Sequence, residues 1–208
     1  MSISYAVTVC NEFIEIQRLL AFLMHGIRRD DEIVVLVDLS KNTQTSELLG
    51  YLHKLSSNNR ITLIEDTFND DFADWKNRLT RACTKDYIFQ IDADELPTHY
   101  MMDFIPEVLK LNEVDVFKVP RVNTVKGLTE EHIQKWGWRV NDKGWVNFPD
   151  HQWRIYRNTP EIKWKNKVHE VLEGYETISY LPSSEEWSLI HEKTIEKQEK
   201  QNEYYGRI

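Results

Sequence analysis

The 208-residue sequence carries 26 Lys and Arg against 34 Asp and Glu, a formal charge of −8, and 41% of its residues are hydrophobic. These values exclude wholesale disorder, and the acidic sign argues against a general nucleic-acid binder, which usually presents a basic surface. No apolar run approaches the roughly 18 residues that span a bilayer, and no signal-peptide pattern follows Met1. Cys10 and Cys83 are too few for a disulfide framework, so we expect a reducing cytoplasm.

The first half of the sequence alternates apolar strands with helices. We expect strands over residues 3–9, 33–37, 61–64 and 87–91, helices over 13–25, 46–55 and 72–83, and a polar loop over 40–45. A run that is apolar on both faces, such as 33–37, is typical of a parallel sheet covered by helices. The order predicts an α/β fold with its functional groups at strand ends. The sequence contains neither G-x-G-x-x-G nor a P-loop motif, which removes the main support for those nucleotide sites.

Six of the seven Trp residues lie in the second half of the sequence, which indicates that the two halves have different tasks. We expect helices over 101–111, around 129–136 and over 192–205, strands over 114–119, 152–156 and 162–168, and a short apolar segment at 187–191. The last two strands are predicted to pair as a hairpin that turns near 158–160. The rest of 121–152 is a loop-rich region, and so long a loop in a compact domain is often functional. We expect one domain over residues 1–208, divided functionally near residue 97.

Three carboxylates, Asp92, Asp94 and Glu95, directly follow the expected strand 87–91. Clustered like charges repel and raise one another's pKa, and a divalent cation relieves that repulsion. Hard oxygen ligands suit Mg²⁺ or Mn²⁺, which commonly bind one or two carboxylates together with substrate phosphates. The D-x-D pattern therefore predicts a metal site at a strand end. The alternative is a solvated acidic turn that caps a following helix.

Several segments, in order along the chain, resemble family 2 nucleotide-sugar glycosyltransferases. They are ISYAVTVCNE (3–12), DEIVVLVDLSKNTQT (31–45) and FADWKNRLTRACTKDYIFQIDADE (72–95), followed by VPRVN, FPDHQWRIYR, KVHE and LIHEK. The later segments are similar to a subgroup with bacterial lipopolysaccharide-core β-glucosyltransferases and glycosyltransferase domains of large DNA viruses. Leu39 and Lys41 depart from the small residues of the family's second-strand loop.

The resemblance implies a GT-A fold, in which helices flank a Rossmann-like, mainly parallel central sheet and a mixed C-terminal part serves the acceptor. It implies a nucleotide-diphosphate sugar donor, with UDP favoured, a carbohydrate acceptor, Mn²⁺ or Mg²⁺, and inversion at the anomeric carbon. Residues 1–97 would bind the nucleotide sugar and residues 98–208 the acceptor. The enzyme would act in the cytoplasm, of the host if it is viral, without a nucleic-acid partner or a transmembrane segment, and the chain can be part of a longer multi-domain enzyme.

By the same resemblance, Asp94 is the expected direct metal ligand, while Asp92 contacts the ribose or the metal through water. A C-terminal His often completes such a site, and both His169 and His191 fit that place, with Lys193 able to reach the diphosphate. The two histidines are not separable by sequence. For each, the alternative is a hydrogen-bonded structural His.

The remaining donor contacts implied by the resemblance come from the strand ends and the third helix. They are Val9, Asn11, Glu12 and Ala93 in the nucleotide pocket, Asp38 at the nucleobase or ribose, and Lys76 and Arg78 at the diphosphate. The alternative for Asp38 is a capping or turn role, and the alternative for Lys76 and Arg78 is a place on a solvated helix face. Cys10 is expected to be a small core residue, because no basic partner accompanies it in sequence.

Asp150 is the expected catalytic base, with Glu170 the next candidate. Displacement at an anomeric carbon needs a carboxylate that takes the proton of the acceptor hydroxyl. Surrounding aromatic residues are predicted to shield Asp150 and to raise its pKa towards the working range of a base. Trp136, Trp138, Trp145 and Trp153 either stack on sugar rings or fill the core.

Two other functions stay open at the sequence level. A nucleotidyltransferase acting on a sugar phosphate also combines an α/β sheet with carboxylate-bound Mg²⁺, but a Gly- and Arg-rich N-terminal loop is missing. A catalytically inactive carbohydrate-binding module would keep the Trp residues, but would not need Asp92, Asp94 and Asp150.

Overall fold

The computed structural model describes residues 1–40 and 46–205. Most of the expected polar loop 40–45, including Lys41, lies outside these residues. Within them, no helix is long and apolar enough to cross a bilayer. The helices are α1 (Phe13–Gly26), α2 (Ser46–Ser57), α3 (Phe72–Ala82), α4 (His99–Leu111), α5 (Glu130–Trp136), the 3-10 helix η1 (Glu185–Trp187) and α6 (Ile195–Tyr205). The strands are β1 (Ile3–Val9), β2 (Glu32–Asp38), β3 (Thr62–Asp66), β4 (Tyr87–Asp92), β5 (Glu95–Pro97), β6 (Val116–Val119), β7 (Arg121–Lys126), β8 (Gln152–Arg157), β9 (Lys163–Lys165), β10 (Val171–Glu173), β11 (Ile178–Tyr180) and β12 (Leu189–Thr194).

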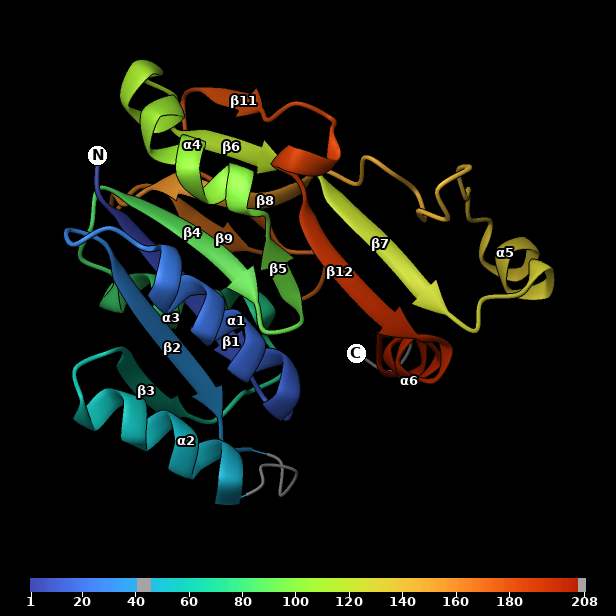
Figure 1. Ribbon diagram of the computed structural model, residues 1–208, viewed down its shortest axis with the longest axis horizontal. Helices are drawn as coiled ribbons and strands as arrows, with labels where there is room; N and C mark the ends of the chain where they lie inside the picture. Colours follow the sequence, from blue (N-terminus) through green and yellow to red (C-terminus); the bar gives the residue numbers. More distant parts are fainter. Residues whose placement is uncertain (41–45, 206–208) are drawn as a thin grey trace.

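A seven-stranded sheet in the order β11-β6-β8-β4-β1-β2-β3 forms the centre of the molecule (Figure 1). Strands β1 to β4 run parallel, whereas β8 runs antiparallel to both of its neighbours, β4 and β6. The sheet therefore combines strands from both halves of the sequence. The α/β class with a mainly parallel sheet, expected from the alternation of apolar strands and helices, is confirmed.

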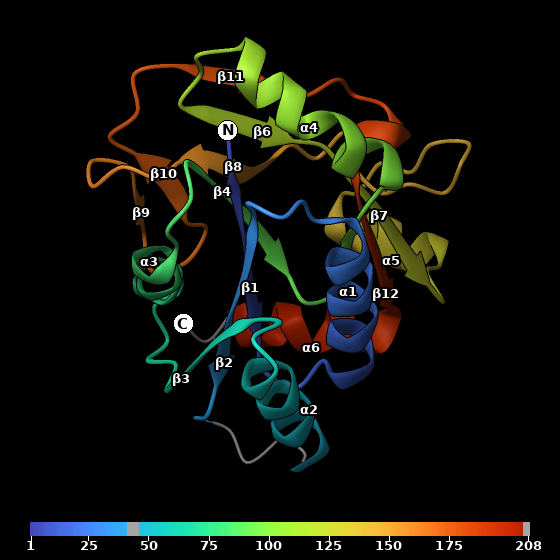
Figure 2. The ribbon, with the colours of Figure 1, turned by 60° about the vertical axis from the view of Figure 1, so that its left-hand side comes forward.

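Helices cover both faces of this sheet, and Figure 2 shows α3 on one side and α1 on the other. One core joins alternate residues of β1 and β4 to α1, α2 and α4, with Leu20, Leu52 and Ile105 fully buried in it. The other core packs α3 and the β9–β10 ribbon on the opposite face, through Leu79 and Trp164. Burial of both faces explains why the strand sequences are apolar throughout.

A second sheet, β5-β12-β7, continues from the end of β4 and carries the C-terminal part of the chain. Strand β12 lies between β5 and β7, antiparallel to the first and parallel to the second. Helix α6 follows β12 and returns to the first half, where Lys197 pairs with Glu15 of α1 and the Tyr204 hydroxyl donates to Asp70 (2.6 Å). The C-terminal segment is thereby held beside the ends of the parallel strands.

Three predictions for the second half are wrong. Strands β8 and β9 form no hairpin, because β8 enters the main sheet between β4 and β6 while β9 pairs with β10. Residues 121–126 form β7 rather than a loop. The last helix begins at Ile195 and not at 192, because residues 189–194 are held in β12.

Candidate active site

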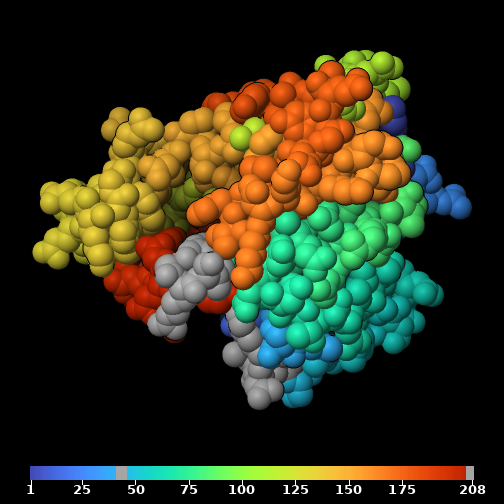
Figure 3. All heavy atoms as spheres, turned by 180° about the vertical axis from the view of Figure 1, so that it is seen from behind, coloured from blue at the N-terminus to red at the C-terminus, as the bar shows by residue number. Residues whose placement is uncertain are grey.

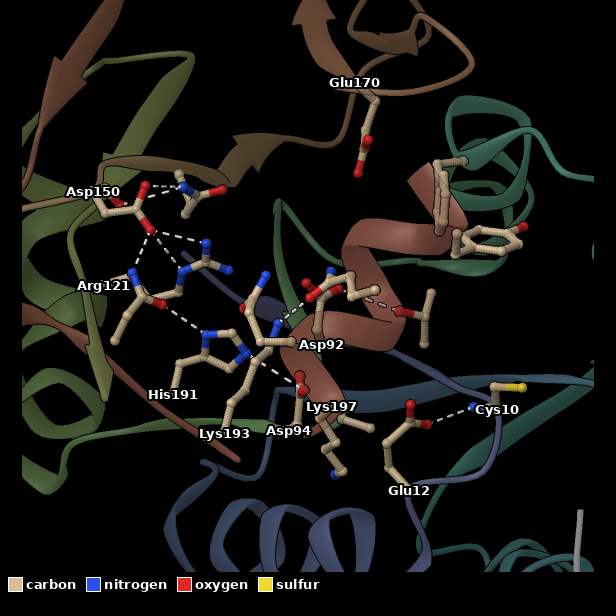
Figure 4. A pocket seen from close by; sticks show the side chains of 18 of the residues that line it. Cys10, Glu12, Asp92, Asp94, Arg121, Asp150, Glu170, His191, Lys193 and Lys197 are labelled. Carbon is tan, nitrogen blue, oxygen red and sulfur yellow. Dashed lines mark hydrogen bonds and ion pairs between the residues drawn. The ribbon is translucent and has the colours of Figure 1, made fainter. Parts of the chain in front are cut away.

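A pocket of about 900 Å³ opens where the parallel strands end. Its walls come from the ends of β1, β2 and β4, from β7, β8 and β12, and from α3 and α6. On the face seen in Figure 3, the segment around β9 and β10 (orange) lies against α3 (green), with α6 (red) across from them. Polar and charged side chains from both halves of the sequence meet inside it (Figure 4).

Asp94 and His191 lie side by side in this pocket. Asp94 occupies the turn after β4, and His191 is placed on β12 opposite Glu95 of β5, so that its Nε2 is 3.4 Å from Asp94 Oδ2. Burial raises the pKa of Asp94, but the hydrogen bond and charge of His191 and the charge of Lys193 outweigh it, so the pKa lies below its usual value. Asp94 is therefore an ionised carboxylate beside an imidazole nitrogen.

This pair fits a divalent cation only with help from a ligand. Over residues 1–40 and 46–205, no group of three or more His, Cys, Asp or Glu side chains gathers closely enough to hold a metal. A carboxylate oxygen and an imidazole nitrogen suit Mn²⁺, and Mg²⁺ commonly takes one or two carboxylates and completes its coordination with substrate phosphates and water. The residues present match an incomplete site of that kind.

The other two carboxylates of the D-x-D segment are neutralised by arginines. Arg154 Nη2 lies 2.6 Å from both Asp92 Oδ2 and Glu95 Oε1, and Arg121 Nη1 lies 3.0 Å from the same Glu95 oxygen. Burial raises the pKa of Asp92, but Arg154, Lys76 and Arg121 hold it well below its usual value. Two cations of the chain, Arg121 and Arg154, therefore already offset the charges of Asp92 and Glu95, in addition to any contribution from the expected metal.

Asp150 lies in the pocket wall opposite the donor-side strand ends (Figure 4). Its carboxylate accepts hydrogen bonds from Arg121, from Asn123 Nδ2 (2.7 Å) and from Gln152 Nε2 (2.7 Å). Burial alone would raise the pKa of Asp150. The charge of Arg121 and the hydrogen bonds from the three donors outweigh that effect, so the pKa lies below its usual value. The predicted rise in this pKa is wrong, because charged and polar donors, not aromatic rings, surround the carboxylate.

Asp38 organises the end of β2. It accepts from the backbone N–H of Ser40 (2.7 Å) and Phe68 (3.0 Å) and from the Ser40 hydroxyl (2.9 Å), and with these bonds its pKa stays low despite burial. Cys10 Sγ lies 3.5 Å from the same carboxylate and lines the pocket, so it is not the core residue that was expected. The backbone N–H groups of Cys10 and Asn11 donate to Glu12, which shapes the turn after β1.

The strand-end residues Val9, Asn11, Glu12 and Ala93 all line the pocket. Lys76 lines it too, where it pairs with Glu170 and lies over the Trp164 ring at 4.4 Å. Lys193 is partly buried, and burial lowers its pKa although Asp94 is near; its Nζ donates to Gln201 of α6 (2.5 Å).

Arg78 is not brought into the pocket. It pairs instead with Asp74 (2.6 Å) on its own helix and with Asp66 (2.8 Å) at the end of β3, and it is not among the residues that line the cavity. Its neighbour Lys76 faces the pocket because it lies two residues away, on a different face of α3.

His169 and some of the aromatic residues line the pocket, while other aromatic residues lie outside it. His169 and Glu170 line the pocket from the loop between β9 and β10, while the bond to Asp94 comes from His191. Trp138 and Trp153 also line it, whereas Trp136 packs on Trp138 (4.7 Å between ring centroids) and Trp145 on Phe148 (4.8 Å). The backbone N–H of Trp138 donates to Ile133 O (3.0 Å) past Gly137, whose φ of 64° allows the helix to end there.

Among the pocket residues that sequence reasoning missed are the four that surround Asp92, Glu95 and Asp150, namely Arg121, Asn123, Gln152 and Arg154. Arg154 is only 3% exposed, and a buried arginine must be paired with carboxylates. The signal was present in the clustered Asp92, Asp94 and Glu95, which needed counter-charges from the chain as well as from a metal. No local pattern indicates which arginines supply them.

Comparisons with known proteins follow this geometry. A sequence model of the family described as Glycosyl transferase family 2 matches residues 4–176. No curated protein matches the chain. The crystal structure of S. aureus TarS 1-349 superimposes with a TM-score of 0.63 at 15% identity, covering 92% of this chain and 60% of the TarS chain. The crystal structure of the same fragment in complex with UDP-GlcNAc superimposes with a TM-score of 0.63 at 16% identity, covering 93% of this chain and 59% of the TarS chain. At such identities the likeness shows the fold, and this chain spans about 60% of the fragment that it matches.

Proposed function

The chain belongs to glycosyl transferase family 2 and has the GT-A fold, and from that premise we propose that it moves a sugar from a nucleoside-diphosphate donor to a hydroxyl of a carbohydrate acceptor. The observation that carries this proposal is the pocket itself, which is lined by the ionised Asp94 beside His191, by Asp38 at the end of β2 and by Asp150. Family membership makes the chain a glycosyltransferase, so the nucleotidyltransferase alternative loses its support.

A divalent cation, Mn²⁺ or Mg²⁺, would be held by Asp94 and His191, with Asp92 acting through water. When bound, it would offset the negative charge that develops on the leaving nucleoside diphosphate. Lys193 and Lys76 would share that task from the chain's own side, since both ammonium groups line the pocket. Asp94 stays deprotonated, as a metal ligand must, because His191 and Lys193 hold its pKa down.

The nucleotide would lie against the ends of β1 and β2. Asp38 is 4% exposed and its carboxylate is fixed by three hydrogen bonds, which supports a role in orienting the base or ribose. We propose UDP as the nucleotide, because a carboxylate oxygen can accept the N3–H of uracil. Val9, Asn11, Glu12 and Ala93 would complete this wall, and Arg78 is left out because of its outward ion pairs.

Asp150 would act as the base on the acceptor side. Arg121, Asn123 and Gln152 fix its carboxylate, and its lowered pKa keeps it ionised and ready to accept the proton of an acceptor hydroxyl. A base that activates the attacking hydroxyl on the face opposite the leaving group inverts the anomeric carbon. Trp138 and Trp153 offer aromatic surface for acceptor sugars beside it.

We propose a single functional domain, with donor binding by residues 1–97 and acceptor binding by residues 98–208. Activity in the cytoplasm, of the host for a viral enzyme, is supported by Cys10 and Cys83, which form no disulfide in the described part of the chain. The chain would act alone or within a longer enzyme, since it spans about 60% of the TarS fragment.

A thermal-shift comparison of UDP, ADP and GDP, each with Mn²⁺, tests the donor assignment. A ligand that binds only the folded state at about 100 times its Kd adds about 2.7 kcal/mol of stability. We expect UDP with Mn²⁺ to raise the Tm most, and EDTA to remove most of the rise. An equal or larger rise with ADP would contradict the choice of nucleotide, and no rise with any nucleotide would contradict the proposed function.

A further inference from the structure

An unbroken series of hydrogen bonds joins the metal side of the pocket to the acceptor side. His191 Nδ1 lies 2.7 Å from Asn123 Oδ1, and Asn123 Nδ2 lies 2.7 Å from Asp150 Oδ2. On its other nitrogen, His191 faces Asp94 at 3.4 Å. Figure 4 shows Asp94, His191 and Asp150 in this succession. Among the described residues, Asn123 is the side chain that links His191 to Asp150 through these two bonds.

The backbone sets this arrangement. Strands β7 and β12 are parallel neighbours, and their register places Asn123 directly beside His191. Because side chains alternate along a strand, Arg121 and Asn123 face the same way, and so do His191 and Lys193. All four line the pocket. The backbone C=O of Asn123 also accepts from Val146 N–H (2.9 Å), which fixes the strand on its other edge.

The direction of each bond follows from donor and acceptor chemistry. The Asp150 carboxylate is ionised and can only accept, so the asparagine group that faces it must be the NH₂. The asparagine carbonyl oxygen then faces His191 and can only accept, so Nδ1 of His191 must carry a proton. With Nδ1 protonated, Nε2 is the nitrogen whose proton can be exchanged: without a cation Nε2–H donates to Asp94, and a cation that displaces this proton would find the Nε2 lone pair beside Asp94.

We propose that Asn123 is a positioning residue for both parts of the reaction, an inference that rests on the proposed function. Its carbonyl oxygen holds His191 in the Nδ1–H tautomer, with Nε2 presented beside Asp94, and its NH₂ group holds the carboxylate of Asp150. Partners of this kind, which bond the outer nitrogen of a ligating histidine, typically change metal affinity or activity about 10–100-fold when they are lost.

Two substitutions separate the two bonds. Asn123→Leu has a similar size and removes both. Asn123→Asp keeps an oxygen that accepts from His191 Nδ1–H, but it can no longer donate to Asp150 and places a second negative charge beside it. Asn112→Leu is the matched control, because Asn112 is exposed at the end of α4 and its side chain bonds only to Val108 O in the described contacts.

The measurement is Mn²⁺ affinity in the presence of UDP, followed by electron paramagnetic resonance of the free ion, alongside UDP release with a panel of simple glycosides as acceptors. We expect Asn123→Leu to weaken Mn²⁺ binding about 10–100-fold. Asn123→Asp should retain the Mn²⁺ affinity of the wild type and yet lose acceptor-stimulated turnover by a similar factor. Asn112→Leu should match the wild type in both, and the Tm of each variant checks its fold.

Wild-type Mn²⁺ affinity in a folded Asn123→Leu variant would overturn the role at His191, and full acceptor-stimulated turnover in Asn123→Asp would overturn the role at Asp150. If Asn123→Leu does not fold, Asn123→Asp decides alone, and its loss of Mn²⁺ affinity would count against the tautomer argument. Absence of Mn²⁺ and UDP binding in the wild type would instead overturn the proposed function, and this inference with it.

Discussion

At the residue scale, the two carboxylates to which we assign a function owe their ionised state to different neighbours. Asp94 is stabilised by His191 and Lys193, and Asp150 by Arg121, Asn123 and Gln152. In both cases burial alone would favour the neutral acid, and charged or polar donors reverse that preference. In the proposed mechanism the same residue type would serve as a metal ligand on one side of the pocket and as a proton acceptor on the other.

Substituting Asp150→Asn should lower kcat by about 10²–10⁴-fold, the usual contribution of a general base. The affinity for UDP with Mn²⁺ should stay close to that of the wild type, because Asp150 lies on the acceptor side. Steady-state kinetics and calorimetry on the same preparation give both values. Glu170→Gln serves as the comparison. Unchanged turnover in Asp150→Asn with a collapse in Glu170→Gln would transfer the base role to Glu170.

The lowered pKa of Asp150 also predicts the pH dependence of the reaction. The base is active when ionised, and a folded-state pKa below the ordinary value of about 3.9 keeps it ionised throughout neutral pH. We therefore expect that Asp150 produces no fall in kcat/KM between about pH 8 and 6. A rate that decreases across this window in the wild type, but not in Asp150→Asn measured at its residual rate, would show that the pKa is raised.

At the element scale, the β9–β10 ribbon is fastened to α3 beneath the pocket. Asn77 of α3 exchanges two hydrogen bonds with the backbone of Trp164 (2.8 and 2.9 Å), and Lys76 pairs with Glu170 in the loop that follows β9. The side chains of Lys76 and Glu170 are only 7% and 18% exposed, so each charge is stabilised mainly by the other and little by water. The ribbon positions one wall of the site through a largely buried ion pair.

Removal of the Glu170 carboxylate should accordingly destabilise the protein. Glu170→Ala leaves the Lys76 charge buried without its partner, which typically costs about 3–5 kcal/mol. Glu173→Ala, which breaks the exposed pair with Lys165 on the same ribbon, should change the unfolding free energy much less, because solvent screens this pair. Urea denaturation of the two variants measures the difference. Equal losses of unfolding free energy would mean that burial does not make the Lys76–Glu170 pair more important for stability than the exposed Lys165–Glu173 pair.

Elements of the first half were predictable because each is a local pattern. The predicted strand 33–37 is one residue shorter than β2 at each end, and the predicted helix 13–25 is one residue shorter than α1 at its C-terminal end. In the second half, β8 enters the main sheet far from its sequence neighbours, and β9, β10 and β11 have three residues each. Strands of three residues are too short to show the alternation of apolar and polar residues, and tertiary packing determines which strands they pair with.

At the scale of the whole molecule, the pocket exists because distant segments converge on the end of the parallel sheet. Asp38, Asp92 and Asp94 were predictable there, since parallel strands end at one edge. His191 could be nominated only together with His169, because the pairing of β12 with β5, which places His191 3.4 Å from Asp94, cannot be read from the sequence. Arg121 and Arg154 were missed because a buried, paired arginine cannot be distinguished in sequence from one on the surface.

The most direct test of the central claim, metal-dependent sugar transfer from a nucleotide donor, is UDP release from UDP-sugars by the wild type and by Asp94→Asn. Release by the wild type should require Mn²⁺ or Mg²⁺, cease with EDTA and rise when an acceptor is added. Asp94→Asn removes the ligand charge beside His191, so it should keep the wild-type Tm without nucleotide and lose Mn²⁺-dependent release. Full release by Asp94→Asn, or release by the wild type that is insensitive to EDTA, would contradict the account.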